Sequence, residues 1–272
     1  MRPALWFLAP AAAVAALLAA DGVPSPEAPR INVGGVVNAA SSIPAPNNFV
    51  SPGAIVSIYG TGLAKDARVA GQGDLDGGFL PVTLGGVTVL FQQAGNPSFN
   101  GILAPLFYIS PLQINAQVPL ELQPGQWQIQ VKVDSLQSSD MVVVQPFSPG
   151  LFASFRHVDG TLVTPKSPAR PSEFILFFGT GFGPTFPAIH TGEVPPLLSQ
   201  FWLAEPVQVQ ATIGGEALTK PDIYYWGLAP GFAGLYQFNL RVPAGAATGN
   251  LEVRIGVDQQ WSQPGVTIPV SR

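Results

Sequence analysis

The chain contains no cysteine, so disulfide bonds cannot stabilise it. A lipid-anchored bacterial export signal is excluded for the same reason, because it needs a cysteine directly after its cleavage site. Each folded unit must therefore rely on its hydrophobic core.

Charged residues are scarce as well, at 10% of the chain against about a quarter in ordinary soluble domains. The formal net charge is −4, and lysines and arginines do not cluster along the sequence. Both features argue against a nucleic-acid partner, because such binding depends on neutralising phosphates. Beyond the first 20 residues, no run has the three-to-four spacing of an amphipathic helix, and no segment is suited to span a membrane.

Glycine, proline and apolar residues are abundant. The 30 glycines and 29 prolines punctuate short apolar runs, which is typical of turn-rich β structure. Glycine follows no fixed period and 47% of the residues are hydrophobic, so collagen and disorder fit poorly.

The N-terminus has the pattern of an export signal. Arg2 precedes an apolar stretch over residues 4–20, and cleavage is expected near Ala20. An uncleaved membrane anchor is the alternative, because the apolar stretch is long. We therefore expect export to the periplasm, the cell surface or the medium, with residues 1–20 as a signal peptide and residues 21–30 as a linker.

One β unit occurs twice. Residues 113–119 (QINAQVP) recur as residues 237–243 (QFNLRVP), and the alternating run 127–133 recurs at 251–257. Two shorter segments also match between the copies: YGTGL at 59–63 matches FGTGF at 178–182, and LGG at 84–86 matches IGG at 213–215. Such self-similarity predicts two units, which we place at residues 31–148 and 149–272.

The apolar pattern of each unit is that of a β-sheet. Residues 127–133 alternate between apolar and polar side chains, as in a strand with one buried face. The run 173–178 does not alternate, and it predicts a central strand buried on both faces. About seven short strands per unit favour two tandem immunoglobulin-like β-sandwiches, an all-β fold. The other expected strands are 54–59, 82–91, 106–109, 114–118, 141–145, 207–213, 223–226, 235–242 and 266–270.

Several segments carry a family resemblance. Residues 55–63 (IVSIYGTGL) and 175–183 (ILFFGTGFG) resemble the opening strand and turn of IPT/TIG immunoglobulin-like domains of the E-set type. The mature chain resembles the uncharacterised C-terminal domain family abundant in Acidobacteria of the Solibacter type. This resemblance implies the fold and export, and nothing about chemistry. It is carried by residues 36–41 (VVNAAS), 84–87 (LGGV), 110–119 (SPLQINAQVP) and 227–237 (GLAPGFAGLYQ).

Three motifs invite a chemical interpretation. The glycine-rich run 179–183 precedes Pro184 rather than a helix, so we interpret it as a turn and not a nucleotide loop. Asp74 and Asp76 have calcium-loop spacing but lack the later ligands, which favours a solvated hairpin. His157 and His190 are the only histidines, and neither lies in a catalytic motif. No catalytic residue, cofactor or metal site is predicted.

Aromatic side chains are the best lead to a ligand. The candidate contact residues are Phe201, Trp202, Tyr224, Tyr225 and Trp226. The first two lie in a long connection rich in proline and leucine, and such loops are often functional. Aromatic rings suit a sugar or an apolar protein surface, although packing inside the sandwiches is the alternative for most of them.

The copies also differ on the polar face of the repeated strand, where Gln128, Gln130 and Lys132 become Glu252, Arg254 and Gly256. Specific function is expected in such differences, chiefly in the second copy.

Three functions are compatible with these features. The first is a secreted, non-enzymatic binding or adhesion module for a polysaccharide or an envelope protein. The second is a structural spacer of the cell envelope. The third is a hydrolase, which requires a histidine to meet a serine and a carboxylate in a cleft. The sequence leaves the oligomeric state open.

Overall fold

The structure is a computed structural model that describes residues 28–93, 95 and 100–272. The expected signal peptide and residues 21–27 of the expected linker lie outside the described residues. Arg30, the last residue of that linker, instead belongs to the first strand. Of the described residues, none belongs to an α-helix, and no helix among them could cross a membrane.

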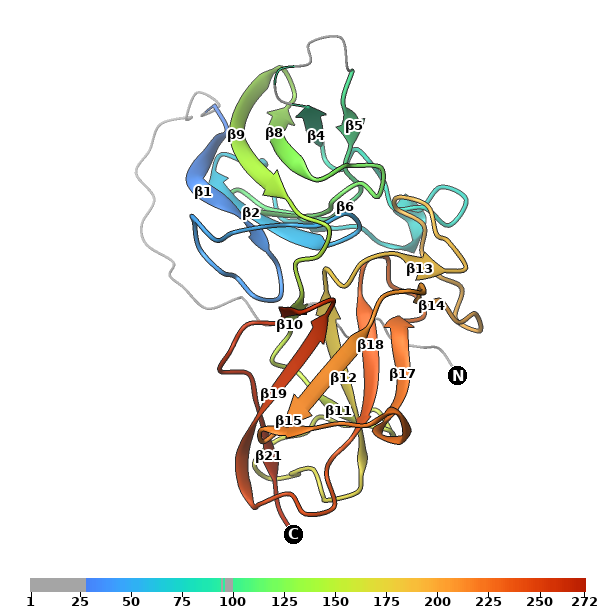
Figure 1. The fold of residues 1–272 in the computed structure, drawn as a ribbon. Helices are drawn as coiled ribbons and strands as arrows, with labels where there is room; N and C mark the ends of the chain where they lie inside the picture. Colours follow the sequence, from blue (N-terminus) through green and yellow to red (C-terminus); the bar gives the residue numbers. More distant parts are fainter. Residues whose placement is uncertain (1–27, 94, 96–99) are drawn as a thin grey trace.

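The N-terminal half, residues 28–148, contains two antiparallel sheets (Figure 1). One sheet has the strand order β1-β2-β7-β6-β3 and the other β5-β4-β8-β9. A short 3-10 helix, η1 (Gln72–Asp74), follows β3. The strands are β1 (Arg30–Asn38), β2 (Ile55–Thr61), β3 (Arg68–Val69), β4 (Val87–Gln93), β5 (Ile102–Leu103), β6 (Leu106–Ile109), β7 (Gln113–Gln117), β8 (Gly125–Val133) and β9 (Leu136–Val144).

The C-terminal half, residues 149–272, also has two sheets. The larger has the order β10-β12-β18-β17-β14-β13, with β11 beside β12; the smaller has the order β16-β15-β19-β20, with β21 beside β19. The 3-10 helix η2 (Lys220–Asp222) precedes β17. The strands are β10 (Gly150–Leu151), β11 (Arg156–His157), β12 (Phe174–Thr180), β13 (Thr185–Phe186), β14 (Trp202–Leu203), β15 (Val209–Ile213), β16 (Glu216–Ala217), β17 (Ile223–Leu228), β18 (Tyr236–Arg241), β19 (Gly249–Val257), β20 (Gln260–Trp261) and β21 (Thr267–Val270).

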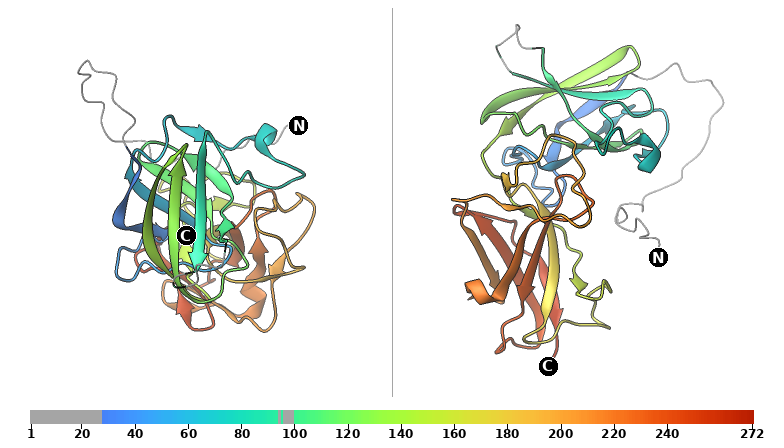
Figure 2. Two further views of the ribbon diagram at one scale, coloured as in Figure 1. Left: turned by 90° about the horizontal axis from the view of Figure 1, so that it is seen from above. Right: turned by 90° about the vertical axis from the view of Figure 1, so that its right-hand side faces the viewer.

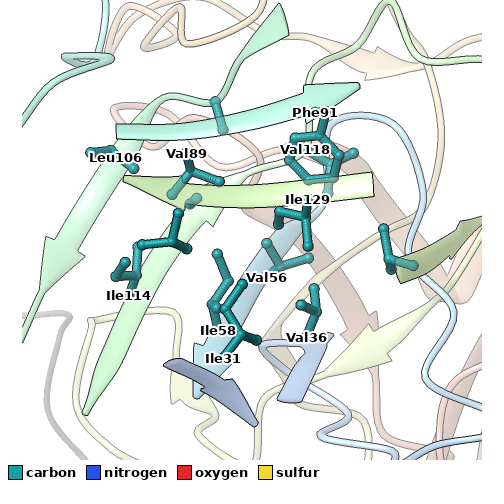
Figure 3. Packing of buried hydrophobic residues seen from close by; sticks show 14 of the residues in the cluster. Ile31, Val36, Val56, Ile58, Val89, Phe91, Leu106, Ile114, Val118 and Ile129 are labelled. Atoms are coloured by element: carbon teal, nitrogen blue, oxygen red, sulfur yellow. The ribbon is translucent and has the colours of Figure 1, made fainter. Parts of the chain in front are cut away.

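Each half encloses one hydrophobic cluster, which lies between its two sheets. In Figure 3, Ile58 and Ile114 from one sheet of the N-terminal half face Val89 and Ile129 from the other. All four side chains are fully buried. This packing confirms the all-β prediction of two immunoglobulin-like sandwiches.

The two copies share their backbone pairing. Strand β2 pairs with β7 so that Tyr59 lies opposite Gln113, and β12 pairs with β18 so that Phe178 lies opposite Gln237. The repeated Gln-x-Asn segment makes the same contact in both halves. In each, the glutamine Nε2 donates to the asparagine Oδ1 two residues later, at 2.8 Å. The repeated sequence therefore forms the same strand pair with the same side-chain hydrogen bond in both halves.

One sequence match proves not to be equivalent. Gly85 and Gly86 precede β4, whereas Gly214 and Gly215 follow β15. Yet β4 and β15 are equivalent strands of the two halves. Strand β4 pairs with β8 and β15 pairs with β19, and β8 and β19 carry the repeated alternating run. Both glycine pairs have positive φ angles, as a tight hairpin turn requires. The match therefore reflects the same turn type at opposite ends of equivalent strands.

The prediction that the run 173–178 is buried on both faces is wrong in part. Strand β12 is central, with β18 on one side and β10 and β11 on the other. Ile175 and Phe177 are fully buried, but the alternating residues Phe174, Leu176 and Phe178 are only half-buried. The second face of β12 thus carries an apolar stripe that is only partly buried.

The two sandwiches stack end to end, and the connection before β14 reaches the N-terminal half (Figures 1 and 2). Gly192 in this connection accepts a hydrogen bond from Leu80 N and donates one to Gln117 Oε1, at 2.8 and 2.7 Å. At the end of β12, Thr180 Oγ1 accepts from Ile55 N at 2.8 Å. These buried hydrogen bonds join the halves.

Candidate functional site

Three strands at the edge of the larger C-terminal sheet bring aromatic residues together. Phe186 of β13 lies opposite Trp202 of β14, and Trp202 lies opposite Gly227 of β17. The ring of Trp202 packs edge to face against Tyr225 and Trp226, with centroid distances of 4.7 and 5.3 Å. Residues separated by up to 40 positions thus form one cluster.

This cluster borders an open hollow of about 440 Å³ beside the junction. Phe186 is 72% exposed, while Trp202 and Trp226 are half-buried. Glu205 is exposed and supplies a carboxylate. The hollow therefore combines flat apolar walls with one anionic hydrogen-bond acceptor. Its lining residues are Phe186, Trp202, Leu203, Ala204, Glu205 and Trp226.

Buried neighbours hold the aromatic walls in place. Phe201 and Leu203 flank Trp202 in the chain and insert into the core, which fixes β14. The Tyr225 hydroxyl donates to the Leu228 carbonyl at 2.7 Å, and burial raises the pKa of this tyrosine. The rings around Trp202 are thus oriented before any ligand arrives, which lowers the entropic cost of binding.

The five aromatic candidates do not form a single patch. Phe201 and Tyr225 are buried and have structural roles, whereas Trp202 and Trp226 line the hollow. Tyr224 is 73% exposed but contacts Phe174 instead, with a ring-centroid distance of 5.9 Å.

Sequence reasoning missed Phe186 and Glu205, which complete the hollow. Phe186 belongs to a two-residue strand without any periodicity, so only its pairing with β14 reveals its position.

The residues that differ on the repeated strand of the second copy make structural contacts. Arg254 Nε donates to the Ser262 carbonyl, and Glu252 Oε1 accepts from Gly265 N, at 2.8 and 2.7 Å. A Cβ atom at Gly256 would lie 2.9 Å from the Trp261 ring. The chain after β19 therefore folds over this face, which gives all three differences a structural role.

The other sequence motifs also have structural roles. Asp74 forms an ion pair with Arg68 and accepts a hydrogen bond from Gly71 N at 2.9 Å, so its carboxylate is engaged within its own loop. Gly179 lies in β12 at a close backbone crossing with Gly150. Within the described residues, no three histidine or acidic side chains converge to hold a metal ion.

His157 meets a serine and a carboxylate, as the hydrolase hypothesis requires. Its Nδ1 lies 2.6 Å from Glu173 Oε1, and its Nε2 lies 3.3 Å from Ser167 Oγ. However, Nε2 is closer to the Ser167 carbonyl oxygen, at 3.1 Å. Two acceptors at the two ring nitrogens favour the doubly protonated imidazolium, which cannot take a proton from the serine. The arrangement stabilises a charged histidine rather than a nucleophile.

His157 is expected to make the stability depend on pH. Burial alone lowers its pKa, but hydrogen bonds to Glu173 and to the Ser167 carbonyl together raise it above the usual value. A raised folded-state pKa stabilises the protein fully below about pH 6.5 and progressively less as pH rises through the folded value. Glu173→Gln should therefore lower the free energy of unfolding by about 1.5–3 kcal/mol at pH 5.5, and by much less at pH 8.5. Urea unfolding at both pH values measures this, with exposed Glu216→Gln as the control. An equal loss at both pH values would contradict the assignment.

No family model and no curated protein matches the chain, so membership of the Solibacter-type family stays a prediction. Solved structures match weakly. The plexin A4 extracellular region aligns with 12% identity and a TM-score of 0.29, over 96% of this chain and 20% of its own. The Bacteroides ovatus SGBP-B of a mixed-linkage glucan utilization locus, in complex with a heptasaccharide, gives 13% and 0.32, over 85% and 45%. The S-layer protein SbsC, domains 5–6, gives 10% and 0.25, over 89% and 98%. The chain thus spans about a fifth of the plexin and under half of the glucan-locus protein, and such low similarity says nothing about its ligand.

Proposed function

We propose that the chain is an exported, non-enzymatic binding module that recognises a carbohydrate chain through the hollow of Phe186, Trp202 and Trp226. The proposal is carried by the aromatic walls beside Glu205, which are the exposed ring of Phe186 and the half-buried rings of Trp202 and Trp226. Aromatic rings pack against the apolar C–H faces of sugars, and a carboxylate accepts hydrogen bonds from sugar hydroxyls. Both ring nitrogens of His157 face acceptors, which disfavours its use as a general base and supports a non-enzymatic role.

The first test is a binding panel. The mature protein is titrated with neutral and anionic polysaccharides by isothermal calorimetry, while tryptophan fluorescence reports on Trp202 and Trp226. We expect binding of at least one polysaccharide with a fluorescence change. Uniform absence of binding would count against the proposal.

Variants locate the binding site. Phe186→Ala removes a ring that is 72% exposed, so it should leave stability within about 0.5 kcal/mol and weaken binding by about tenfold, or 1.4 kcal/mol. Trp202→Ala should weaken binding at least as much. The matched control is Tyr59→Ala, which removes an exposed ring from the other half. Unchanged affinity in Phe186→Ala and Trp202→Ala would place the site elsewhere.

A structural spacer is the second candidate, and the junction supports it. Backbone and side-chain hydrogen bonds from Leu80, Gln117 and Ile55 fix one half on the other. A spacer should bind nothing in the panel and should behave in small-angle X-ray scattering as one rigid, elongated particle.

A further inference from the structure

The larger sheet of the C-terminal half has an apolar stripe that is only partly buried. Phe174, Leu176 and Phe178 alternate along β12 with the fully buried Ile175 and Phe177, and each is only half-buried. A strand with two apolar faces is normally covered on both. In the described residues nothing covers this second face fully.

The continuous apolar character of the stripe is specific to the second copy. At the equivalent positions, β2 carries Ile55, Ser57 and Tyr59. Ser57 is buried there, and its hydroxyl donates to Asn115 Oδ1 at 3.0 Å. The central position of this face is thus a buried, hydrogen-bonded serine in the N-terminal half and the half-buried, apolar Leu176 in the C-terminal half.

A cation and an exposed ring border the stripe. Arg241 of β18 lies opposite Phe174, with its guanidinium carbon 4.7 Å from the ring centroid. Tyr224 is 73% exposed and lies at a bulge between β17 and β18, where the extra residue redirects its side chain. We call Phe174, Leu176, Tyr224 and Arg241 the arginine face.

Few acidic side chains lie near the positive charge of Arg241 on this face. The closest acidic group to Arg241 is Asp222, whose carboxylate lies 4.0 Å away and also accepts hydrogen bonds from Thr219. Glu173 contacts His157, which lies opposite the buried Ile175 and therefore on the core face of the sheet. Across the stripe, Arg156 lies opposite Leu176 and donates to the Gly160 carbonyl. A second cation thus borders the same face.

We propose that the arginine face binds an anionic polysaccharide, with carboxylate or sulfate groups on Arg241 and sugar rings against Tyr224 and the apolar stripe. Trp202 of the hollow pairs with Gly227, Gly227 with Gln237, and Gln237 with Phe178. Directly paired residues of a sheet share a face, so one linear polymer can cross the stripe and reach the hollow. This proposal rests on the proposed function, carbohydrate binding, and specifies that the carbohydrate is anionic. A second copy of the chain fits less well, because two-fold pairing would bring like charges together.

The test uses polygalacturonate and heparin as anionic probes, dextran as the neutral probe and poly-L-glutamate as the acidic peptide. We expect wild type to bind the anionic polysaccharides more tightly at low salt, because surface charge interactions are screened by salt. Arg241→Gln should weaken that binding by about tenfold or more and reduce its salt dependence, and Arg241→Lys should restore part of it. Tyr224→Ala, at an exposed position, should weaken binding without altering the melting temperature.

The control is Lys132→Gln, which removes an exposed cation from the N-terminal half. Wild-type affinity in Arg241→Gln and Tyr224→Ala would overturn the proposal. Arg241-dependent binding of poly-L-glutamate at equal affinity would also overturn it, since the ligand would then be an acidic peptide. If Phe186→Ala and Trp202→Ala keep full affinity while Arg241→Gln loses it, the arginine face stands and the proposed role of the hollow fails.

Discussion

Gly179→Ala is expected to lower the free energy of unfolding by about 3 kcal/mol. A Cβ atom on Gly179 would lie 2.3 Å from the Gly150 carbonyl oxygen and 2.7 Å from the Phe182 ring. The first neighbour is backbone and belongs to β10, which pairs with β12 at this position. The backbone cannot move aside without breaking that pairing, so the substitution must displace β10 or distort β12.

The repeat provides a second instance and two controls. Gly60 occupies the equivalent position in β2, where a Cβ atom would lie 2.1 Å from the Arg30 carbonyl oxygen of β1. Gly60→Ala should therefore cost a similar amount. Gly73→Ala and Gly245→Ala, where no atom lies within 4 Å of the added carbon, should stay within about 0.5 kcal/mol of wild type. Urea unfolding followed by tryptophan fluorescence and circular dichroism measures all four. A loss below about 1 kcal/mol in both Gly179→Ala and Gly60→Ala would show that the strands adjust freely.

Local periodicity predicted the strands that carry the two cores. In β8 the apolar positions Trp127, Ile129, Val131 and Val133 are all buried, as their alternation requires. The expected start of β4 at residue 82 was too early, because Gly85 and Gly86 form a turn before it. Boundaries of this kind depend on turn chemistry, which a hydrophobic pattern does not show.

The strands whose positions depend on tertiary contacts were not predicted from the sequence. Strands β10, β13 and β14 have two residues each, too few for any period to appear. Their positions depend on partners far away in the sequence, such as Gly179 for β10. Strand β1 was missed because Gly34 and Gly35 interrupt its alternation, with a register shift between Ile31 and Val36.

The candidate site was only partly predictable for the same reason. Trp202 and Trp226 could be named because large aromatic residues stand out in a connection and a short strand. Their association depends on the pairing of β14 with β17, and Phe186 enters only through the pairing of β13 with β14. The arginine face could not be predicted for a different reason. The apolar run in β12 predicts burial on both faces, and nothing in the local sequence shows that one face is only partly buried.

Thr180→Val is expected to lower the free energy of unfolding by about 2–4 kcal/mol, because it removes both hydrogen bonds of a buried hydroxyl. Thr180 is fully buried between the halves, and its Oγ1 accepts from Ile55 N at 2.8 Å and donates to the Gly234 carbonyl at 2.7 Å. Valine has the same shape, so it leaves a backbone donor and a backbone acceptor unpaired in a site that stays closed. Thr180→Ser keeps the hydroxyl and should lose less.

The repeat again supplies the matched control. Thr61 holds the same place in the first copy of the motif but is exposed at the end of β2, so Thr61→Val should stay within about 0.5 kcal/mol of wild type. Calorimetry adds a second readout. If the junction couples two units that can each fold alone, Thr180→Val should divide one unfolding transition into two, and Thr61→Val should not. A Thr180→Val protein with wild-type stability and a single transition would show that the hydroxyl does not hold the halves together. The buried hydrogen bonds around Gly192 would then be the contacts that set the angle between the hollow and the N-terminal half.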